Sequence, residues 1–432
     1  MSAELSQTPS TPGGGPLPLL SAADVDSAAK RIAGVVTPTP LQFSERLSAT
    51  TAASVYLKRE DLQTVRSYKL RGAYNLLVQL SDAEIAAGVV CSSAGNHAQG
   101  FAYACRSLGI HGRVYVPAKT PKQKRDRIRY HGGDFIELIV GGSTYDLAAE
   151  AALADVARTG ATLVPPFDDP RTIAGQGTIA VEVLDQLDGE PDLVVVPVGG
   201  GGCIAGITTY LTERTTNTSV LGIEPAGAAA MMAALANGGP VTLDYVDQFV
   251  DGAAVSRAGA LTYAALAAAG DMVSITTVDE GAVCTAMLDL YQNEGIIAEP
   301  AGALAVAGLL EADVEPDTTV VCLVSGGNND VSRYGEILER SLVHLGLKHY
   351  FLVDFPQEPG ALRRFLDDVL GPNDDITLFE YVKRNNRETG EALVGIELGS
   401  AADLDGLLER MQATEMQVEK LDPNSPAYRY LL

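Results

Sequence analysis

The segment DLVVVPVGGGGCIAG, residues 192–206, joins an apolar run to four consecutive glycines and then to a helical pattern. Its apolar side chains are consecutive rather than alternating, which is typical of a parallel strand buried on both faces. Glycines let the backbone approach an anion closely, and the N-terminus of a following helix favours negative charge. The segment therefore predicts a parallel α/β fold with a phosphate-binding turn at Gly199–Gly202.

Two other interpretations of this glycine turn are a dinucleotide-binding fingerprint and a plain tight turn. The fingerprint uses three spaced glycines, which four consecutive ones match poorly, although the acidic Glu224 does end the next predicted strand. A P-loop is excluded because no Lys-Ser or Lys-Thr pair follows the glycines. Phosphate binding is the preferred interpretation, and the two alternatives stay open at this point.

The same order of strand, turn and helix repeats from about residue 55 to residue 325. We expect helices at 69–80, 97–107, 121–131, 144–157 and 175–187. The strands that we expect lie at 54–60, 89–93, 112–117, 134–140, 192–198, 219–225, 272–278 and 318–327. Strands and helices that alternate in this way indicate an α/β domain with parallel sheets.

A different pattern begins after about residue 345. Strands are expected at 349–355, 376–384, 391–398 and 416–421, helices at 358–370 and 401–412, and a hairpin-like turn at NNRETG, 385–390. This β-α-β-β-α-β order is the ferredoxin-like motif. The predicted organisation is a disordered lead-in at 1–20, a large domain at 21–345 and a smaller domain at 346–432.

Composition narrows the class of function. The 432 residues include 31 Lys plus Arg and 55 Asp plus Glu, for a net charge of −24. Such a surface repels nucleic-acid backbones and anionic lipid, so neither is an expected partner. Tryptophan is absent and only 6% of residues are aromatic, which argues against an aromatic sugar-binding platform. A small-molecule enzyme is the class that remains.

The N-terminus and the cysteines indicate the compartment. The first twenty residues, MSAELSQTPSTPGGGPLPLL, lack the basic and apolar regions of a signal peptide, and no apolar run approaches the roughly 20 residues that span a bilayer. No cluster has the ligand spacing of a transition-metal site. The five cysteines lie within apolar segments and are Cys91, Cys105, Cys203, Cys284 and Cys322. An odd number of cysteines in such segments fits a reducing compartment, so we expect a cytoplasmic protein.

Three further motifs accompany the glycine turn: SYKLRGA at 67–73 with Lys69, SSAGNHAQG at 92–100, and SGGN at 325–328. Each is weak alone, because the lysine could lie at the surface, Ser93 or Asn96 could merely cap a helix, and SGGN is also a turn signal. Together they suit pyridoxal phosphate. This cofactor needs a Schiff-base lysine, a phosphate site and a group facing its ring nitrogen.

These four motifs and YLKREDLQ, residues 56–63, resemble the fold-type II pyridoxal-phosphate enzymes of the tryptophan synthase β class. Within that class they look like the biosynthetic threonine dehydratases, over about residues 25–432. The resemblance implies a two-lobed catalytic domain with parallel sheets. FPQEPGAL at 355–362 and ALVGIEL at 392–398 resemble the ACT-like regulatory domain of the same family.

The resemblance also implies roles for individual residues. Lys69 would carry the cofactor as a Schiff base and remove the Cα proton, and Ser325 would face the ring nitrogen. His97 is expected to be a structural neighbour, and Glu299 either lies near the cofactor or begins a helix. The remaining implied contacts are Asn96 with the phenolic oxygen, Gly199, Gly200, Gly201, Gly202 and Cys203 with the phosphate, and Ser92, Ser93, Ala94, Gly95 and Asn96 with the substrate carboxylate.

The implied reaction is the dehydration and deamination of L-threonine, and of L-serine, to a keto acid and ammonia. For threonine the product is 2-oxobutanoate, at the first step of isoleucine biosynthesis. The resemblance further implies a homotetramer with isoleucine feedback, opposed by valine, near the loop 356–360. Alternatives are a catabolic serine/threonine dehydratase, a serine racemase, an amino-acid sensor with a degenerate site, and a nicotinamide-dependent dehydrogenase.

Overall fold

The computed structural model describes residues 20–381, 388–422, 425, 428 and 431. The predicted lead-in at 1–20 lies outside the described residues, except for Leu20. The chain forms two compact units, in which the first extends to Asn329 and the second begins at Asp330; Gly281–Asp289 also belongs to the second unit. Among the described residues, no helix has both the length and the apolar character that a membrane span requires.

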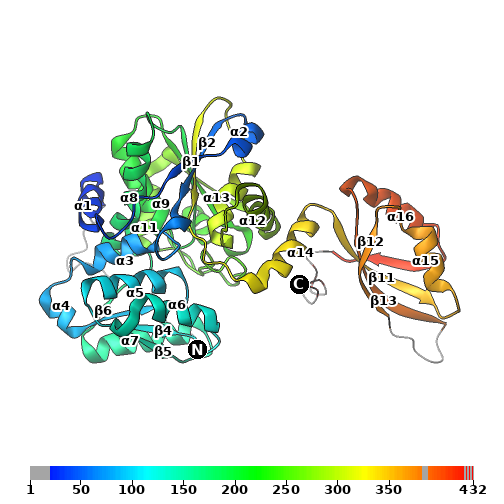
Figure 1. Cartoon of the computed structure of the whole chain (residues 1–432), viewed down its shortest axis with the longest axis horizontal. Coiled ribbons are helices and arrows are strands. Elements are labelled where there is room, and N and C mark those ends of the chain that lie inside the picture. Colours follow the sequence, from blue (N-terminus) through cyan, green and yellow to red (C-terminus); the bar gives the residue numbers. More distant parts are fainter. Residues whose placement is uncertain (1–19, 382–387, 423–424, 426–427, 429–430, 432) are drawn as a thin grey trace. The chain divides into compact units, whose positions relative to one another are not determined.

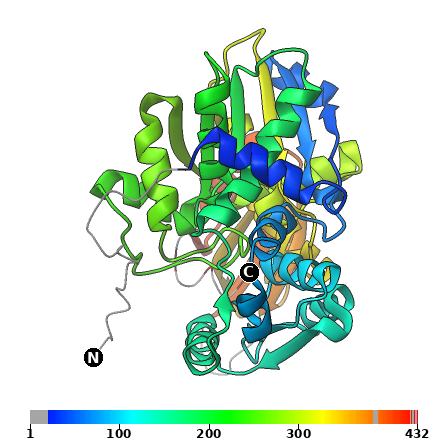
Figure 2. The same cartoon turned by 90° about the vertical axis from the view of Figure 1, so that its left-hand side faces the viewer.

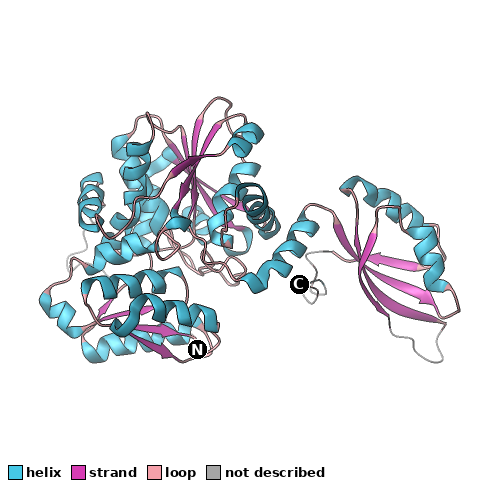
Figure 3. Ribbon diagram, viewed as in Figure 1, coloured by secondary structure: helices cyan, strands magenta, loops and turns pink. Residues whose placement is uncertain are grey.

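The first unit contains a six-stranded sheet whose strands are nearly all parallel (Figure 3). The exception is β1 (Leu41–Phe43), which pairs antiparallel with β2 at the edge of the sheet. The spatial order is β1, β2 (Ser54–Arg59), β10 (Thr319–Val324), β7 (Leu193–Pro197), β8 (Ser219–Pro225) and β9 (Val273–Val278). The predicted parallel α/β fold is therefore confirmed, and β1 is an addition to it.

A second, four-stranded sheet in the same unit is parallel throughout. Its order is β5 (Ile136–Val140), β4 (Gly112–Val116), β3 (Val89–Ser92) and β6 (Thr162–Leu163). All eight strands predicted for this part of the chain are present. Sequence patterning missed β1 and β6 because strands of three and two residues are too short to give a recognisable apolar run.

Helices surround both sheets (Figure 1). All five predicted helices are present, but α8 begins at Pro170 instead of residue 175, because Asp169 caps it and proline suits the first helical position. In Figure 2 the dark blue α1 lies across α8 and α9. The helices are α1 (Ala22–Ile32), α2 (Glu45–Thr51), α3 (Lys69–Leu77), α4 (Asp82–Ala87), α5 (Asn96–Leu108), α6 (Lys122–Gly132), α7 (Tyr145–Thr159), α8 (Pro170–Gln186), α9 (Gly202–Arg214), α10 (Ala230–Asn237), α11 (Ala260–Ala269) and α13 (Pro300–Glu311). A further helix, α12 (Glu280–Glu294), belongs mostly to the second unit.

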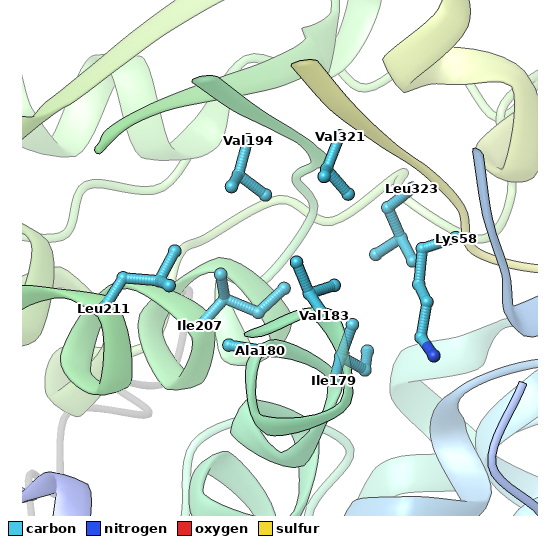
Figure 4. A pocket seen from close by; sticks show the side chains of 9 residues that line it. All are labelled: Lys58, Ile179, Ala180, Val183, Val194, Ile207, Leu211, Val321 and Leu323. Carbon is cyan, nitrogen blue, oxygen red and sulfur yellow. The ribbon is translucent and has the colours of Figure 1, made fainter. Parts of the chain in front are cut away.

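The apolar core of the large sheet leaves one small gap, shown in Figure 4. Its volume is about 10 Å³, which is enough for about one water molecule and far too small for an amino acid. The ammonium of Lys58 points away from the gap and pairs with Glu182 at 2.6 Å. The gap is lined by Lys58, Ile179, Ala180, Val183, Val194, Ile207, Leu211, Val321 and Leu323.

The second unit contains an antiparallel sheet with the spatial order β12-β13-β11-β14. Along the chain its elements follow the β-α-β-β-α-β order predicted from the sequence. Its core includes Phe351, Phe355 and Phe365. The predicted hairpin at 385–390 lies partly outside the described residues. The elements are α14 (Tyr334–His344), β11 (Lys348–Pro356), α15 (Ala361–Val369), β12 (Asp375–Tyr381), β13 (Thr389–Glu397), α16 (Leu404–Gln412) and β14 (Gln417–Lys420).

Candidate active site

The glycine turn connects the end of β7 to the start of α9. Gly201 is the N-cap, with φ of +90°, a backbone conformation that glycine adopts without strain. No side chain caps this helix. Within the described residues, the backbone N–H groups of Gly199, Gly200 and Gly201 donate to no acceptor. The turn therefore offers unused donors at a helix N-terminus, which is the chemistry of an anion site.

Neighbouring side chains hold the turn in place. A Cβ atom on Gly200 would lie 2.3 Å from the ring of Phe167, and one on Gly199 would lie 2.9 Å from the Cα atom of Ala253. The hydroxyl of Thr262 donates to the carbonyl oxygen of Gly200 at 2.7 Å. No sequence pattern identifies Phe167, Ala253 or Thr262 as neighbours of the turn, because each is distant in the chain from the glycines. Side chains larger than hydrogen are excluded from the turn by packing.

Lys69 is the first residue of α3, and the segment before it runs beside the segment after β10. The N–H of Tyr68 donates to the carbonyl oxygen of Ser325 at 3.2 Å, and the N–H of Gly327 donates to that of Arg66 at 2.9 Å. These two hydrogen bonds place SYKLRGA and SGGN side by side. Lys69 and Ser325, which are far apart in sequence, are thereby brought into one site.

The Lys69 ammonium donates to the carbonyl oxygen of Pro166 at 3.3 Å. Burial lowers the pKa of this amine from 10.5 to about 8, although Cys203 and Glu299 act in the opposite direction. A lysine with a lowered pKa is a better nucleophile and base at neutral pH, because more of it carries a free lone pair. Lys69 is therefore suited to covalent chemistry with a carbonyl compound.

This pKa predicts how the protein without cofactor reacts with pyridoxal phosphate. The rate of the absorbance change on mixing should rise with pH and reach half its maximum at about pH 8, because the free amine forms as pH passes the pKa of Lys69. Stopped-flow absorbance from pH 6 to pH 10 measures this. A rate that does not level off by pH 10, as the ordinary lysine value of 10.5 would require, would contradict the prediction.

The loop between β3 and α5 has the features of a second anion site. Gly95 is the N-cap of α5 and no side chain caps the helix. The hydroxyl of Ser93 accepts from the N–H of Gly95 at 3.3 Å, whereas the buried hydroxyl of Ser92 has no partner. Within the described residues, the N–H groups of Ala94 and Asn96 find no acceptor. Capping by Ser93 or Asn96 is thus not observed, and unused donors remain.

Close packing brings this loop to Lys69. A Cβ atom on Gly100 of α5 would lie 2.9 Å from the backbone nitrogen of Leu70 in α3, so the two helices touch. Nε2 of His97 lies 2.8 Å from the carbonyl oxygen of Val164. Burial, followed by the charge of Lys69, lowers the pKa of His97 to about 4, so the ring is neutral at pH 7. The contact with Val164 is consistent with the structural role predicted for His97, which stays a prediction.

Asn96 connects the two sides of the site. Its amide nitrogen donates to the carboxylate of Glu299, and its amide oxygen accepts from Asn328 at 2.8 Å. Glu299 is the N-cap of α13, and burial raises its pKa to about 7. The hydroxyl of Ser325 donates to the carbonyl oxygen of Ala301 at 3.1 Å. The role of Asn328 in fixing Asn96 was not predicted from the sequence.

The predicted site residues all lie in the first unit. Lys69 begins α3, which follows β2 in the chain, and the Ser92–Asn96 loop, the glycine turn and Ser325 stand at the carboxyl ends of β3, β7 and β10. This is the edge at which parallel α/β sheets bind ligands. Burial raises the pKa of the Cys203 thiol, so at neutral pH this residue of α9 is uncharged. Among the residues that the structure covers, no three His, Cys, Asp or Glu side chains form a possible metal site.

Comparison with known proteins agrees with this geometry. The family model described as "Pyridoxal-phosphate dependent enzyme" matches residues 32–326. The chain belongs to this family. A second model, "C-terminal regulatory domain of Threonine dehydratase", matches residues 339–431 of this pyridoxal-phosphate enzyme. The resemblance stated from the four motifs is confirmed, and the alternative of a nicotinamide-dependent dehydrogenase is excluded.

Individual relatives give the same picture. "L-threonine dehydratase biosynthetic IlvA" from Mycobacterium tuberculosis is 88% identical over all 432 residues of both chains. The processed form of threonine deaminase isoform 2 from Solanum lycopersicum has a TM-score of 0.70 and 38% identity, covering 74% of this chain and 87% of that one. Maize serine racemase has a TM-score of 0.69 and 29% identity, covering 76% and 99%.

The residues of the site fit pyridoxal phosphate. The glycine turn has unused N–H donors for a phosphate, and packing keeps side chains out of it. Lys69 supplies an amine with a lowered pKa. Ser67 and Ser92 have buried hydroxyls without a partner among the described residues, so polar groups remain available to a ligand. The cofactor expected from the sequence therefore agrees with both the family and the geometry.

Proposed function

We propose that this enzyme dehydrates and deaminates L-threonine to 2-oxobutanoate and ammonia, as a carbon–nitrogen lyase at the first step of isoleucine biosynthesis. The observation that carries the proposal is the full-length match to a biosynthetic threonine dehydratase, with 88% identity over both chains. The match with maize serine racemase covers 99% of that chain but leaves about a quarter of this one unmatched. A racemase or a catabolic dehydratase does not account for the additional ferredoxin-like domain.

The residues that would hold the cofactor are those around the glycine turn and Lys69. Lys69 would form the covalent link, and the N–H groups of Gly199–Gly202 and Cys203 would bind the phosphate. Asn96 would donate to the phenolic oxygen, and Ser325 would face the ring nitrogen. When bound, pyridoxal phosphate supplies an electron sink that acidifies the substrate Cα–H bond.

The protein's own groups would then perform the proton transfers. The free Lys69 amine would take the Cα proton, which its lowered pKa favours at neutral pH. The N–H groups of the Ser92–Asn96 loop would hold the substrate carboxylate at the start of α5. Ser325 carries no charge, so unlike a carboxylate it would not keep the ring nitrogen protonated. Nε2 of His97 lies 2.8 Å from the carbonyl oxygen of Val164, and we assign this side chain a structural role.

The second unit supports feedback control by an amino acid. Its family model is a regulatory domain, and we propose isoleucine as the inhibitor, with valine opposing it. The loop between β11 and α15, Pro356–Gly360, would lie near the effector. In this loop the N–H of Gln357 donates to the carbonyl oxygen of Glu388 at 2.9 Å, and Gly360 has φ of +88°. A homotetramer and a domain boundary near residue 345 also remain proposals.

We also infer a cytoplasmic location. All five cysteines are buried. Four of them lie in the first unit, namely Cys91, Cys105, Cys203 and Cys322, and the fifth is Cys284. The thiols of the four first-unit cysteines form no disulfide. Unpaired thiols are typical of a reducing compartment.

Keto-acid release from threonine and serine, measured with and without isoleucine and valine, tests the function. Threonine should give 2-oxobutanoate with the higher kcat/KM, and isoleucine should suppress the rate, whereas valine should restore it. A chain that ends at residue 345 should keep turnover and lose the isoleucine response, because the ferredoxin-like sheet is removed. Racemisation of serine without keto-acid release would contradict the proposed reaction, and isoleucine inhibition of the shortened chain would contradict the regulatory role.

A further inference from the structure

A loop between α10 and α11 packs against two parts of the active site. A Cβ atom on Gly252 would lie 2.7 Å from the Cβ atom of Ala301, near the start of α13. On the other side, Ala253 blocks any side chain on Gly199 in the glycine turn. Phe249 and Val250, earlier in the same loop, are buried. The loop is therefore held rigidly against the phosphate-binding turn and against the helix that begins at Glu299.

The same loop is joined to the half of the unit that contains the small sheet. The ammonium of Lys124, on α6, forms an ion pair and hydrogen bond with the carboxylate of Asp251. Their side chains are 29% and 37% exposed. One turn along α6, Nε of Arg127 donates to the amide oxygen of Gln99 at 3.1 Å, in the first turns of α5. Helix α6 thus connects the loop to the helix that carries Asn96.

These charges lie close enough to the active site to influence it. After burial, Asp251 is the main cause of the raised pKa of Glu299, while Lys124 and Arg66 act to lower it. Glu299 in turn accepts from Asn96. The charges of Lys124 and Asp251 therefore act on the carboxylate that accepts the hydrogen bond from Asn96.

We propose that Lys124 and Asp251 are positioning residues, whose ion pair holds the small-sheet half at the correct separation from the glycine turn. The inference rests on the proposed function, in which the Ser92–Asn96 loop binds the substrate carboxylate while the glycine turn binds the cofactor phosphate. These two anion sites lie on opposite halves of the unit, so the substrate and the cofactor to which it is joined must together reach both at once. Neither Lys124 nor Asp251 touches the reacting atoms; their pair sets the distance that the substrate has to bridge.

Charge reversal on the holoenzyme tests this inference. Lys124→Glu and Asp251→Lys should each raise KM for threonine about fivefold, as expected for loss of a partly exposed ion pair and its replacement by repulsion. The double variant, Lys124→Glu with Asp251→Lys, restores opposite charges and should return KM to within about twofold of the wild type. In all three variants kcat and the visible absorbance of the bound cofactor should stay within about twofold, because Lys69 and the glycine turn are unchanged.

Lys122→Glu is the matched control on the same helix. Lys122 pairs with Asp126 within α6 and is 82% exposed, so the same change of charge should leave KM unchanged. The inference is overturned if Lys122→Glu raises KM as much as Lys124→Glu, if both single variants leave KM unchanged, or if the charge swap fails to restore it. Failure of the wild type to act on threonine would instead overturn the proposed function. The role of the ion pair would then be tested by measuring KM of the same variants for the amino acid that the wild type does convert.

Discussion

Lys69→Ala should lose the visible absorbance of the protein-linked cofactor and all measurable ammonia release from threonine. The amine of Lys69 is buried and interacts electrostatically with Cys203, and the residue before Lys69 donates its N–H to Ser325. Removal of the Lys69 amine takes away the group that would hold the cofactor covalently and the base that would accept the Cα proton. Loss of a general base alone costs about 10²–10⁴ in rate, and loss of the covalent link adds to this. Absorbance spectra and an ammonia assay measure the two effects.

Two further variants separate chemistry from charge. Lys69→Arg keeps a positive charge but cannot form a Schiff base, so it should lose activity as fully as the alanine variant. Lys122→Ala removes a lysine that is 82% exposed, and it should behave as the wild type. Turnover retained by Lys69→Ala, or by Lys69→Arg, would mean that the covalent chemistry belongs to another residue.

Much of the fold is predictable from short stretches of sequence. Buried parallel strands are continuous apolar runs, and glycine or serine turns end them, so every predicted strand of the first unit was present. The candidate site could also be predicted from the sequence, because its segments each follow or pair with a strand end. These segments are Lys69, the Ser92–Asn96 loop, the glycine turn and Ser325. Topology alone brings these segments together at the carboxyl edge of the sheets.

The contacts that fix the site were not predictable. Phe167 excludes side chains from the glycine turn, and Asn328 orients Asn96, yet neither lies in a periodic pattern. The ion pair of Lys124 and Asp251 joins residues 127 positions apart. On α6 the side chain of Lys122 is 82% exposed and that of Lys124 only 29%, a difference that the run of basic residues does not indicate. Such pairings depend on the tertiary fold, which local propensity does not specify.

A buried ion network beside α3 is another feature that only the fold reveals. Arg71, two residues after Lys69, donates through Nε and Nη2 to both oxygens of Glu60, at 2.8 and 2.7 Å. Its Nη1 donates to Glu182 at 2.6 Å, and Glu182 also accepts from Lys58. The side chains of Arg71 and Glu60 are completely buried. The network ties β2 and α8 to the helix that carries the active-site lysine.

Arg71→Met should therefore destabilise the protein by about 3–5 kcal/mol, because it leaves the carboxylate of Glu60 buried without its main partner. Arg129→Met, the same change in an ion pair at 3.5 Å whose side chains are 55% and 45% exposed, should cost less than about 1 kcal/mol. Denaturant unfolding of the holoenzymes measures both. Equal losses of unfolding free energy in the two variants would mean that the buried network stabilises the protein no more than an exposed ion pair does.

The pH dependence of that loss identifies Glu60 as its source. In the wild type, burial favours neutral Glu60, but the charges of Arg71 and Lys58 and hydrogen bonds outweigh burial and hold its pKa below 4.5. Ionised Glu60 thus stabilises the wild type above its unfolded pKa, and this contribution is lost as pH falls through the folded pKa. Without Arg71 the burial effect should dominate and raise the pKa, so Arg71→Met should lose most stability at pH 8 and least near pH 5. Adding Glu60→Gln to Arg71→Met should remove this pH dependence and recover part of the stability at pH 8. If Arg71→Met instead loses the same free energy of unfolding at both pH values, the loss comes from packing and not from the charge of Glu60.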